Sequence, residues 1–404
     1  MRRVPQLLVT PLLLMVLVIG SGCVRKPNMA PVSRLVAKAP AAGSVVTLDP
    51  TRIRAGDDAL TGLDGYDADD LFQLGYEAFQ REDLGLSILL YSRLIEEFGE
   101  DDTVLPARYN LALSYEKEGS VEAAIQAFSG YVEASSRSLP QEAAETRIRM
   151  AALLQRLGRI AESKGLLDLA LAEPLLILPE RWEAQILYAI VTADEGRFDR
   201  AEWNIKAIGR AIRKRAVKED DRYPFQSAML WYHVGAVFRM RAGSYELDVI
   251  DDLPLLEERL QNKAKDLLEA RQHYKRCLKH MVAAWSGPAA LALGGVYEDF
   301  RRDLLAAPKP SELDTEQSVV YRELLEATTG KFLGRAASDY KEVLRDAQRY
   351  QLETAWVFTI EDALKRCETL LAELAAMTAA GSPETLDPVP AAQAQEVVQD
   401  AAEQ

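Results

Sequence analysis

From residue 67 onward, the chain repeats one pattern of apolar, small and polar positions at helical spacing. Its first copy runs from Leu74 to Leu94 and opens with an apolar–small pair that is followed by a break at Glu82. After the break, Ser87, Tyr91 and Leu94 follow at intervals of four and three residues, which places them on one face of a helix. The segment therefore predicts two amphipathic helices of about 13 residues joined by a short turn.

The same layout returns three more times along the chain. Its turn markers, spaced 37, 39 and 38 residues apart, are Glu82, Gly119, Gly158 and Gly196. One helix pair cannot bury its apolar stripe alone, so successive pairs are expected to stack on their neighbours. The layout resembles the tetratricopeptide repeat (TPR), a helix–turn–helix unit of about 34 residues, with a few residues added between units.

Two later segments match the first helix of this repeat more fully. Trp231, Val234, Gly235 and Phe238 follow its W-x₂-L-G-x₂-Y core with conservative changes, and Leu293–Tyr297 follows L-G-x₂-Y outright. A small residue at this Gly position lets the second helix approach the first closely. The resemblance implies an all-α fold, a right-handed superhelical solenoid of about six to seven helix pairs with a C-terminal capping helix.

Composition and pattern divide the chain into five parts. Residues 24 to about 65 are rich in Pro, Ala and Gly without a sustained period, which is typical of a flexible tether. The end of the chain is rich in Ala, Pro, Glu and Gln, which is typical of disorder. The predicted parts are a signal peptide (1–22), the tether (23–66), the solenoid (67–350, with insertions at 241–262 and 304–316), the capping helix (351–378) and a disordered tail (379–404).

The N-terminus has the marks of a secretory signal peptide. Two arginines precede a short apolar run from Leu7 to Ile19, and three small residues then lead directly into Cys23. This order resembles a bacterial lipoprotein lipobox, which implies that the Cys23 thiol is lipidated. Val24 follows in place of the Asp that retains lipoproteins at the inner membrane, which implies an anchor in the outer membrane facing the periplasm. The alternative is an ordinary signal peptide in which Cys23 is incidental.

Composition narrows the functional classes. Hydrophobic residues make up 48% of the chain, which is ample for a core. The formal net charge of −14 argues against general nucleic-acid binding, which needs a basic surface. Beyond Cys23, only Cys277 and Cys367 remain, and they are predicted to be buried on separate helices. A disulfide between them is the alternative.

Candidate chemistry is sparse. His273, Cys277 and His280 share one face of a predicted helix and could hold a metal ion. The repeat pattern favours the alternative, in which Cys277 packs inward beside Tyr274. The sequence contains no nucleophile elbow, zinc-protease, dithiol or dinucleotide-binding motif. We therefore expect no enzyme activity, no cofactor and no metal.

Two surfaces are candidate binding sites. First helices line the concave groove of such repeats, which implies these groove residues: Phe72, Tyr76, Phe79, Tyr109, Leu113, Glu116, Ile148, Gln155 and Ile186. A basic cluster predicts a docking patch for an acidic partner segment, made of Lys206, Arg210, Arg213, Lys214 and Arg215. Each of these two candidate sites has an alternative explanation that involves no partner. The tether or the next superhelical turn could cover the groove, and the cations could complement the C-terminus of a helix.

Together these features predict a non-enzymatic, lipid-anchored scaffold of the cell envelope that holds partner proteins or peptides in its groove. The resemblance extends to repeat lipoproteins of outer-membrane assembly and gliding-motility complexes. The alternative function is a regulator or activator of a cell-wall enzyme. Membrane contact is expected through the N-terminal lipid alone, and nucleic acid is not an expected partner.

Overall fold

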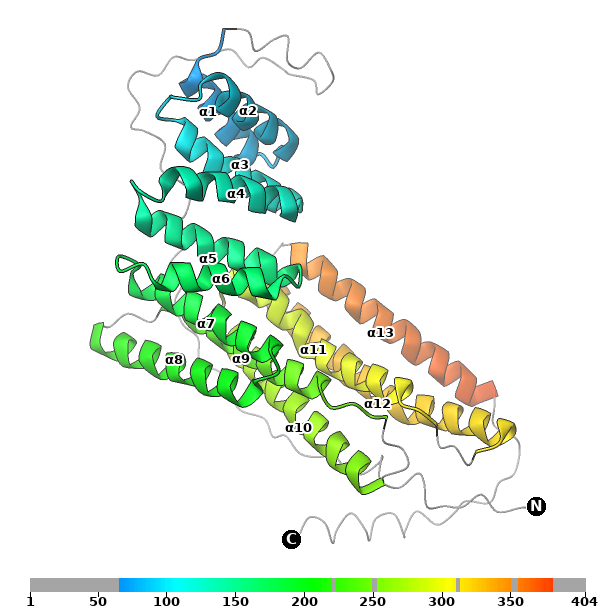
Figure 1. Cartoon of the computed structure of the whole chain (residues 1–404). Coiled ribbons are helices and arrows are strands. Elements are labelled where there is room, and N and C mark those ends of the chain that lie inside the picture. The colour runs from blue at the N-terminus through cyan, green and yellow to red at the C-terminus, as the bar shows by residue number, and fades with distance from the viewer. Residues whose placement is uncertain (1–64, 220–222, 249–252, 310–312, 350–354, 381–404) are drawn as a thin grey trace, which may run out of the picture. The chain divides into compact units, whose positions relative to one another are not determined.

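The computed structural model describes residues 65–219, 223–248, 253–309, 313–349 and 355–380 (Figure 1). The predicted signal peptide, Cys23, almost the whole tether and most of the tail lie outside these residues. The described residues form helices and no strand. The helices are α1 (Ala68–Gln80), α2 (Leu84–Glu97), α3 (Val104–Glu118), α4 (Val121–Ser135), α5 (Pro140–Arg156), α6 (Ile160–Leu171), α7 (Leu178–Asp194), α8 (Phe198–Glu219), α9 (Pro224–Gly243), α10 (Leu253–Leu278), α11 (Ala283–Ala306), α12 (Thr315–Arg349) and α13 (Ala355–Ala380).

The helices belong to two compact units, which divide after Val191, inside α7. In the first unit, consecutive helices from α1 to α6 pack on each other, and α1 also touches α3. In the second, consecutive helices from α8 to α13 pack on each other, and α11 also touches α9 and α13. Each unit is thus built from stacked helix pairs in which first helices meet first helices. This confirms the predicted all-α, TPR-like fold.

The four turn markers found in the sequence share one backbone conformation. Glu82, Gly119, Gly158 and Gly196 have φ values of 62°, 96°, 72° and 77°, in the left-handed region that ends many helices. Each lies just after the first helix of a pair and just before the second. The 37-to-39-residue period therefore marks a real structural position, occupied by glycine in three copies and by a strained glutamate in the first.

Close approach of paired helices also follows the repeat pattern. A β-carbon placed on Gly75 would lie 2.9 Å from Cε1 of Tyr91, so the tyrosine ring of α2 rests on the backbone of α1. The ring of Tyr340 from α12 likewise rests on Gly294 of α11. Both tyrosines are fully buried. The predicted pairing of a small residue with an aromatic one is therefore what sets the distance between the helices of a pair.

The first predicted insertion is largely helical, and the second is mostly a connection between helices. Helix α10 begins at Leu253, so much of 241–262 forms the first turns of a 26-residue helix, and α9 itself extends to Gly243. The segment 304–316 separates α11 from α12, and α12 is a single helix of 35 residues. The extra sequence therefore lengthens the helices of the second unit, while the Gly–Tyr contacts of each pair are kept.

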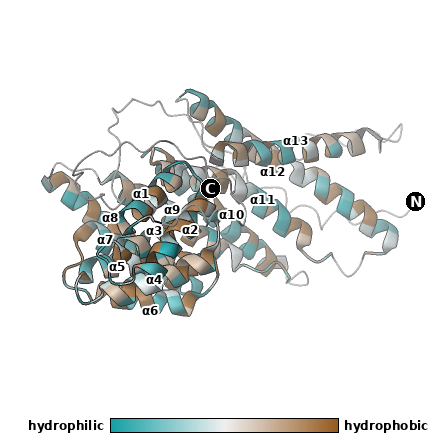
Figure 2. Cartoon of the chain, turned by 90° about the horizontal axis from the view of Figure 1, so that it is seen from above, coloured by the Kyte–Doolittle hydropathy of each residue, from teal (hydrophilic) through white to brown (hydrophobic). Residues whose placement is uncertain are grey.

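The helices carry both hydrophobic and hydrophilic residues along their length (Figure 2). Within the described part of the chain, no helix is long and apolar enough to cross a membrane.

Candidate functional site

Three of the predicted groove residues are buried between helices. Phe72, Ile148 and Ile186 are at most 6% exposed, and the ring of Phe72 packs edge-to-face on Tyr91 with centroids 5.7 Å apart. They face the packed interior, because aliphatic and aromatic side chains at these positions reach the neighbouring helix. The prediction that these three residues offer a surface to a partner is corrected: they support the groove from within.

The remaining predicted groove residues are partly exposed, and several of them contact neighbouring helices. The Lys117 ammonium lies 5.1 Å from the centre of the Phe79 ring, which joins α3 to α1. Glu116 of α3 pairs with Arg149 of α5 at 2.6 Å. The Gln155 side chain of α5 then donates a hydrogen bond of 3.0 Å to the Leu187 carbonyl of α7.

Tyr109 of α3 packs edge-to-face on the rings of Phe128 and Tyr131 from α4, and burial raises the pKa of its hydroxyl. Tyr76 and Leu113 are half-buried. The first helices of this unit are therefore joined one to the next by single contacts. Of the predicted groove, Tyr76, Phe79 and Leu113 leave the most apolar surface for a partner.

A cleft lies in the second unit. It has a volume of about 750 Å³ and crosses α9, α11, α12 and α13. Its apolar lining includes Leu291, Leu333, Trp356, Ile360 and Leu370. A second cleft of about 340 Å³ shares four of its lining residues, so the two are adjacent. The shared residues are Tyr232, Arg239, Asp299 and Arg302.

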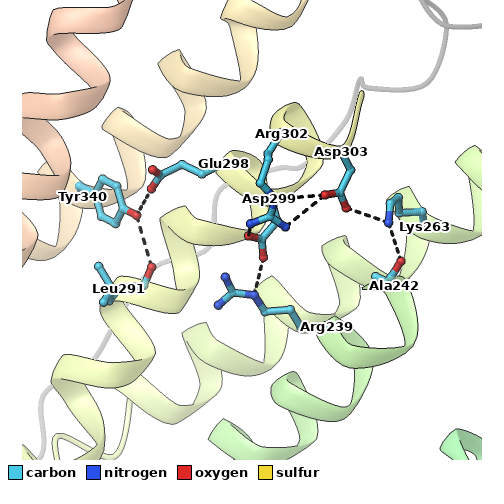
Figure 3. Close-up of polar contacts among 9 residues, drawn as sticks. All are labelled: Arg239, Ala242, Lys263, Leu291, Glu298, Asp299, Arg302, Asp303 and Tyr340. Atoms are coloured by element: carbon cyan, nitrogen blue, oxygen red, sulfur yellow. Dashed lines mark hydrogen bonds and ion pairs between the residues drawn. The ribbon is translucent and has the colours of Figure 1, made fainter. Parts of the chain in front are cut away.

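A chain of ion pairs runs along the polar side of these clefts (Figure 3). Arg239 of α9 contacts Asp299 of α11 at 2.6 Å, and Asp299 also accepts a bond of 2.8 Å from Arg302. Arg302 continues to Asp303 at 3.1 Å. Asp303 in turn pairs with the buried Lys263 of α10 at 2.8 Å. The chain connects α9, α10 and α11 and fixes the position of each charge it contains.

The other charges of the larger cleft are less well matched. The Tyr340 hydroxyl donates to Glu298 and lies 3.3 Å from the Leu291 carbonyl oxygen (Figure 3). Burial and the Glu298 carboxylate raise the pKa of Tyr340, so it stays protonated near neutral pH. Arg301 and Arg366 also line the cleft, and neither forms an ion pair within the described residues. The cleft therefore contains four arginines against two carboxylates.

The candidate metal face of α10 is occupied by packing. The His273 ring stacks on Trp231 and on Phe238, with centroid distances of 5.4 Å in both cases. Burial, together with the charges of Arg276 and Lys206, lowers its pKa to about 4. The Cys277 thiol donates to the Trp285 carbonyl at 3.8 Å, and burial raises its pKa to about 12.

Cys277 and Cys367 are both free thiols, so the alternative of a disulfide between them is wrong. Within the described residues, no group of three or more His, Cys, Asp or Glu side chains is placed to hold a metal ion.

The predicted basic patch lies on α8. Arg210, Arg213 and Lys214 are exposed, and none of them forms an ion pair within the described residues. Lys206 pairs with Glu202 one turn earlier, and Arg215 is half-buried. Of the five cations in the predicted patch, three are therefore exposed and without an ion pair within the described residues, one is ion-paired and one is half-buried.

Comparison with known proteins finds solved structures of low similarity and no family. No family model matches the chain, and no curated protein matches it. A tetratricopeptide repeat protein from Parabacteroides merdae aligns with 74% of this chain and 98% of its own, at 13% identity and a TM-score of 0.36. The TPR2AB domain of yeast Sti1, solved in complex with an Hsp90 peptide, covers 74% and 98% at 12% identity and a TM-score of 0.24.

The human IFIT1 dimer with m7Gppp-AAAA covers 77% of this chain and 72% of its own, at 15% identity and a TM-score of 0.36. Likenesses of this strength carry no argument about ligands or partners. The repeat fold rests on the helix packing described above.

Sequence reasoning placed the groove in the first four repeats and missed the cleft of the second unit. A signal was present, because Leu293–Tyr297 is the best match to the repeat core and is followed at once by Glu298, Asp299, Arg301 and Arg302. Charged residues directly after a first-helix core lie one or two turns along the same helix. What the sequence could not show is that α12 and α13 return to form the opposite wall of the cleft.

Proposed function

We propose that this protein is a non-enzymatic scaffold that binds an extended segment of a partner protein in the cleft of α9, α11, α12 and α13. The observation that carries the proposal is the lining of that cleft, in which an apolar floor adjoins an excess of arginines. Apolar side chains would anchor the segment, and arginines would pair with its carboxylates, since guanidinium groups bind carboxylates in a bidentate fashion.

The shape of the site supports a polypeptide over a small molecule. Small-molecule pockets enclose most of their ligand. Here two adjacent clefts are lined by residues of successive first helices, from Met240 on α9 to Leu370 on α13. A trough of this kind suits a chain that can contact several helices in turn. The Tyr340 hydroxyl and the ion-paired carboxylates around the cleft are held by contacts within the protein.

We further propose that the scaffold works in the cell envelope, anchored by a lipid on Cys23 in the outer membrane and facing the periplasm, as part of a multiprotein complex. The support for this is the N-terminal sequence, with its charged start, short apolar run and small residues before Cys23. An anchor followed by a long Pro- and Ala-rich segment would let the repeat units reach partners away from the bilayer.

Site-specific photocrosslinking in living cells tests the cleft. A benzoylphenylalanine replaces Leu291, which lines the cleft and is exposed, and a matched variant carries it at Phe358, which is exposed on α13 but does not line the cleft. We expect a discrete crosslinked partner with the probe at 291 and none at 358. Adding Arg302→Glu and Arg366→Glu should weaken the adduct. Equal adducts at both positions, or none at 291, would contradict the proposal.

A further inference from the structure

Helix α8 packs into the second unit through one face only. Ala201, Ile205, Ile208 and Ile212 are buried, and their spacing of four, three and four residues marks a single helical stripe. Beyond Ile212 the helix continues to Glu219 with no further buried residue among those whose exposure is described. The opposite face is thus free of core packing, and in the last turns Arg215 and Ala216 are only half-buried.

The opposite face carries a line of residues that we name the outer stripe: Trp203, Arg210, Lys214 and Val217. Their intervals of seven, four and three residues place them along one line of the helix. Trp203 is 61% exposed and Val217 is 87% exposed, so large apolar groups face solvent at both ends of the stripe. At about 1.5 Å per residue, the stripe is about 21 Å long.

The outer stripe and its flanks are strongly basic. Helix α8 contains seven basic and three acidic residues, whereas the whole chain has a net charge of −14. Arg200 lies 5.5 Å from the centre of the Trp203 ring, and Arg213 flanks the stripe on its other side. Because most of the protein repels anions, this face is the one that an anionic surface would attract, and attraction there would orient the whole unit.

We propose that the outer stripe docks α8 on the surface of an anionic lipid bilayer. Clustered lysines and arginines are attracted to anionic headgroups, and tryptophan favours the headgroup region of a bilayer. Helices that lie in the plane of the interface combine such a basic face with exposed apolar side chains. The proposal rests neither on a lipid at Cys23 nor on the cleft of α9 to α13, and it adds a second membrane contact to the anchor.

An acidic protein segment is the alternative binding partner of the outer stripe, and the exposed apolar residues of the stripe argue against it. A folded partner would need pockets that match Trp203 and Val217 while also pairing the cations between them. A fluid interface accepts an indole ring and an isopropyl group about 21 Å apart without matching pockets. The mixture of exposed apolar and cationic groups along one straight line therefore favours lipid.

Vesicle sedimentation of the full-length chain tests the proposal. The vesicles consist of phosphatidylcholine alone or of phosphatidylcholine with about one third phosphatidylglycerol. We expect the anionic vesicles to bind more protein, and Arg210→Glu with Lys214→Glu to reduce that binding at least about tenfold. The matched control, Arg81→Glu with Arg137→Glu, makes the same change in net charge at exposed sites on other segments and should bind like the wild type. The wild type and both double variants share the apolar N-terminal run, so any vesicle binding that this run causes is the same in all three.

A second measurement locates the contact. Brominated phosphatidylglycerol in the vesicles should quench part of the tryptophan fluorescence of the wild type, and Trp203→Phe should lose that part. Equal binding of the wild type to both kinds of vesicle, or equal losses in the two double variants, overturns the proposal. So does binding of a poly-glutamate peptide that depends on Arg210 and Lys214 while the vesicles are ignored, because that result assigns the stripe to an acidic protein segment.

Discussion

A β-carbon placed on Gly235 would lie 2.7 Å from Cε1 of Tyr274. These residues are 39 positions apart in the sequence, whereas Gly75 and Tyr91, which make the same contact in the first pair, are 16 apart. The long α9–α10 connection thus leaves the geometry of the helix pair unchanged. The ring-on-glycine contact is thus the same in these two pairs, although the number of residues between glycine and tyrosine differs.

Gly235→Ala should therefore destabilise the second unit. Its methyl group would meet the buried Tyr274 ring, and overpacking of this kind costs about 1–3 kcal/mol. The control is Gly334→Ala on α12, where nothing lies within 4 Å of the added β-carbon. That variant should be neutral or stabilising by up to about 1 kcal/mol, because alanine favours a helix. Denaturant unfolding of both variants measures the difference, and equal stabilities would show that the contact does not set the helix spacing.

Glu82→Gly should stabilise the first unit by about 1 kcal/mol, because Glu82 has a φ of 62° where the other three turns have glycine. Its exposed carboxylate also pairs with Lys117, at 3.0 Å. Glu82→Ala removes the same ion pair but keeps the unfavourable backbone conformation. The difference in stability between the glycine and alanine variants therefore measures the free-energy cost of that conformation. Thermal unfolding should rank the glycine variant above both wild type and the alanine variant. A glycine variant no more stable than the alanine variant would refute the argument.

Phe72→Ala and Tyr76→Ala should separate core from surface within the predicted groove. Phe72 is buried against Tyr91, and removal of a buried phenylalanine costs about 3–5 kcal/mol. Tyr76 is half-buried, so its truncation should cost much less. Chemical denaturation measures both. Similar losses for the two variants would mean that Tyr76 also belongs to the core, and would remove it from the candidate binding surface.

Two buried histidines should make the second unit sensitive to mild acid. Burial lowers the pKa of His233 and His273 to about 4, below the ordinary value of 6.5. The unfolded chain then binds protons that the folded chain does not, so stability falls as pH drops from about 6.5 towards 4. Between about pH 7 and pH 5 the loss is about 2 kcal/mol per histidine. The double variant His233→Gln with His273→Gln should flatten this dependence, and an unchanged slope would assign the acid sensitivity to other groups.

Cys23→Ser tests the predicted lipid anchor. In cells grown with labelled palmitate, the wild-type protein should carry the label and sediment with membranes. The serine variant should lose the label, because the predicted lipid is attached through the Cys23 thiol, which serine lacks. Cys277→Ser and Cys367→Ser serve as controls, since both of these thiols are buried. Labelling that persists in the Cys23 variant would show that Cys23 is incidental.

The sequence by itself determined the helix pairs, because both of their signals are local. The 37-to-39-residue period marks four left-handed turns, and the small and large residues that pack together in each pair follow from helical spacing. The inward packing of Cys277 beside Tyr274 was also correct, since both are buried. The spacing of residues on a helix face is set by the local backbone geometry, so it can be recognised in a single sequence.

Only the tertiary structure decided which surfaces remain open. Phe72 and Tyr76 are neighbours on one helix, yet the first is buried and the second is half-exposed. The larger cleft requires Leu291 and Leu370, from α11 and α13, to line one space. Exposure depends on how far each neighbouring helix extends and at what distance it packs. Those quantities arise from contacts between residues far apart in the chain, which no local pattern records.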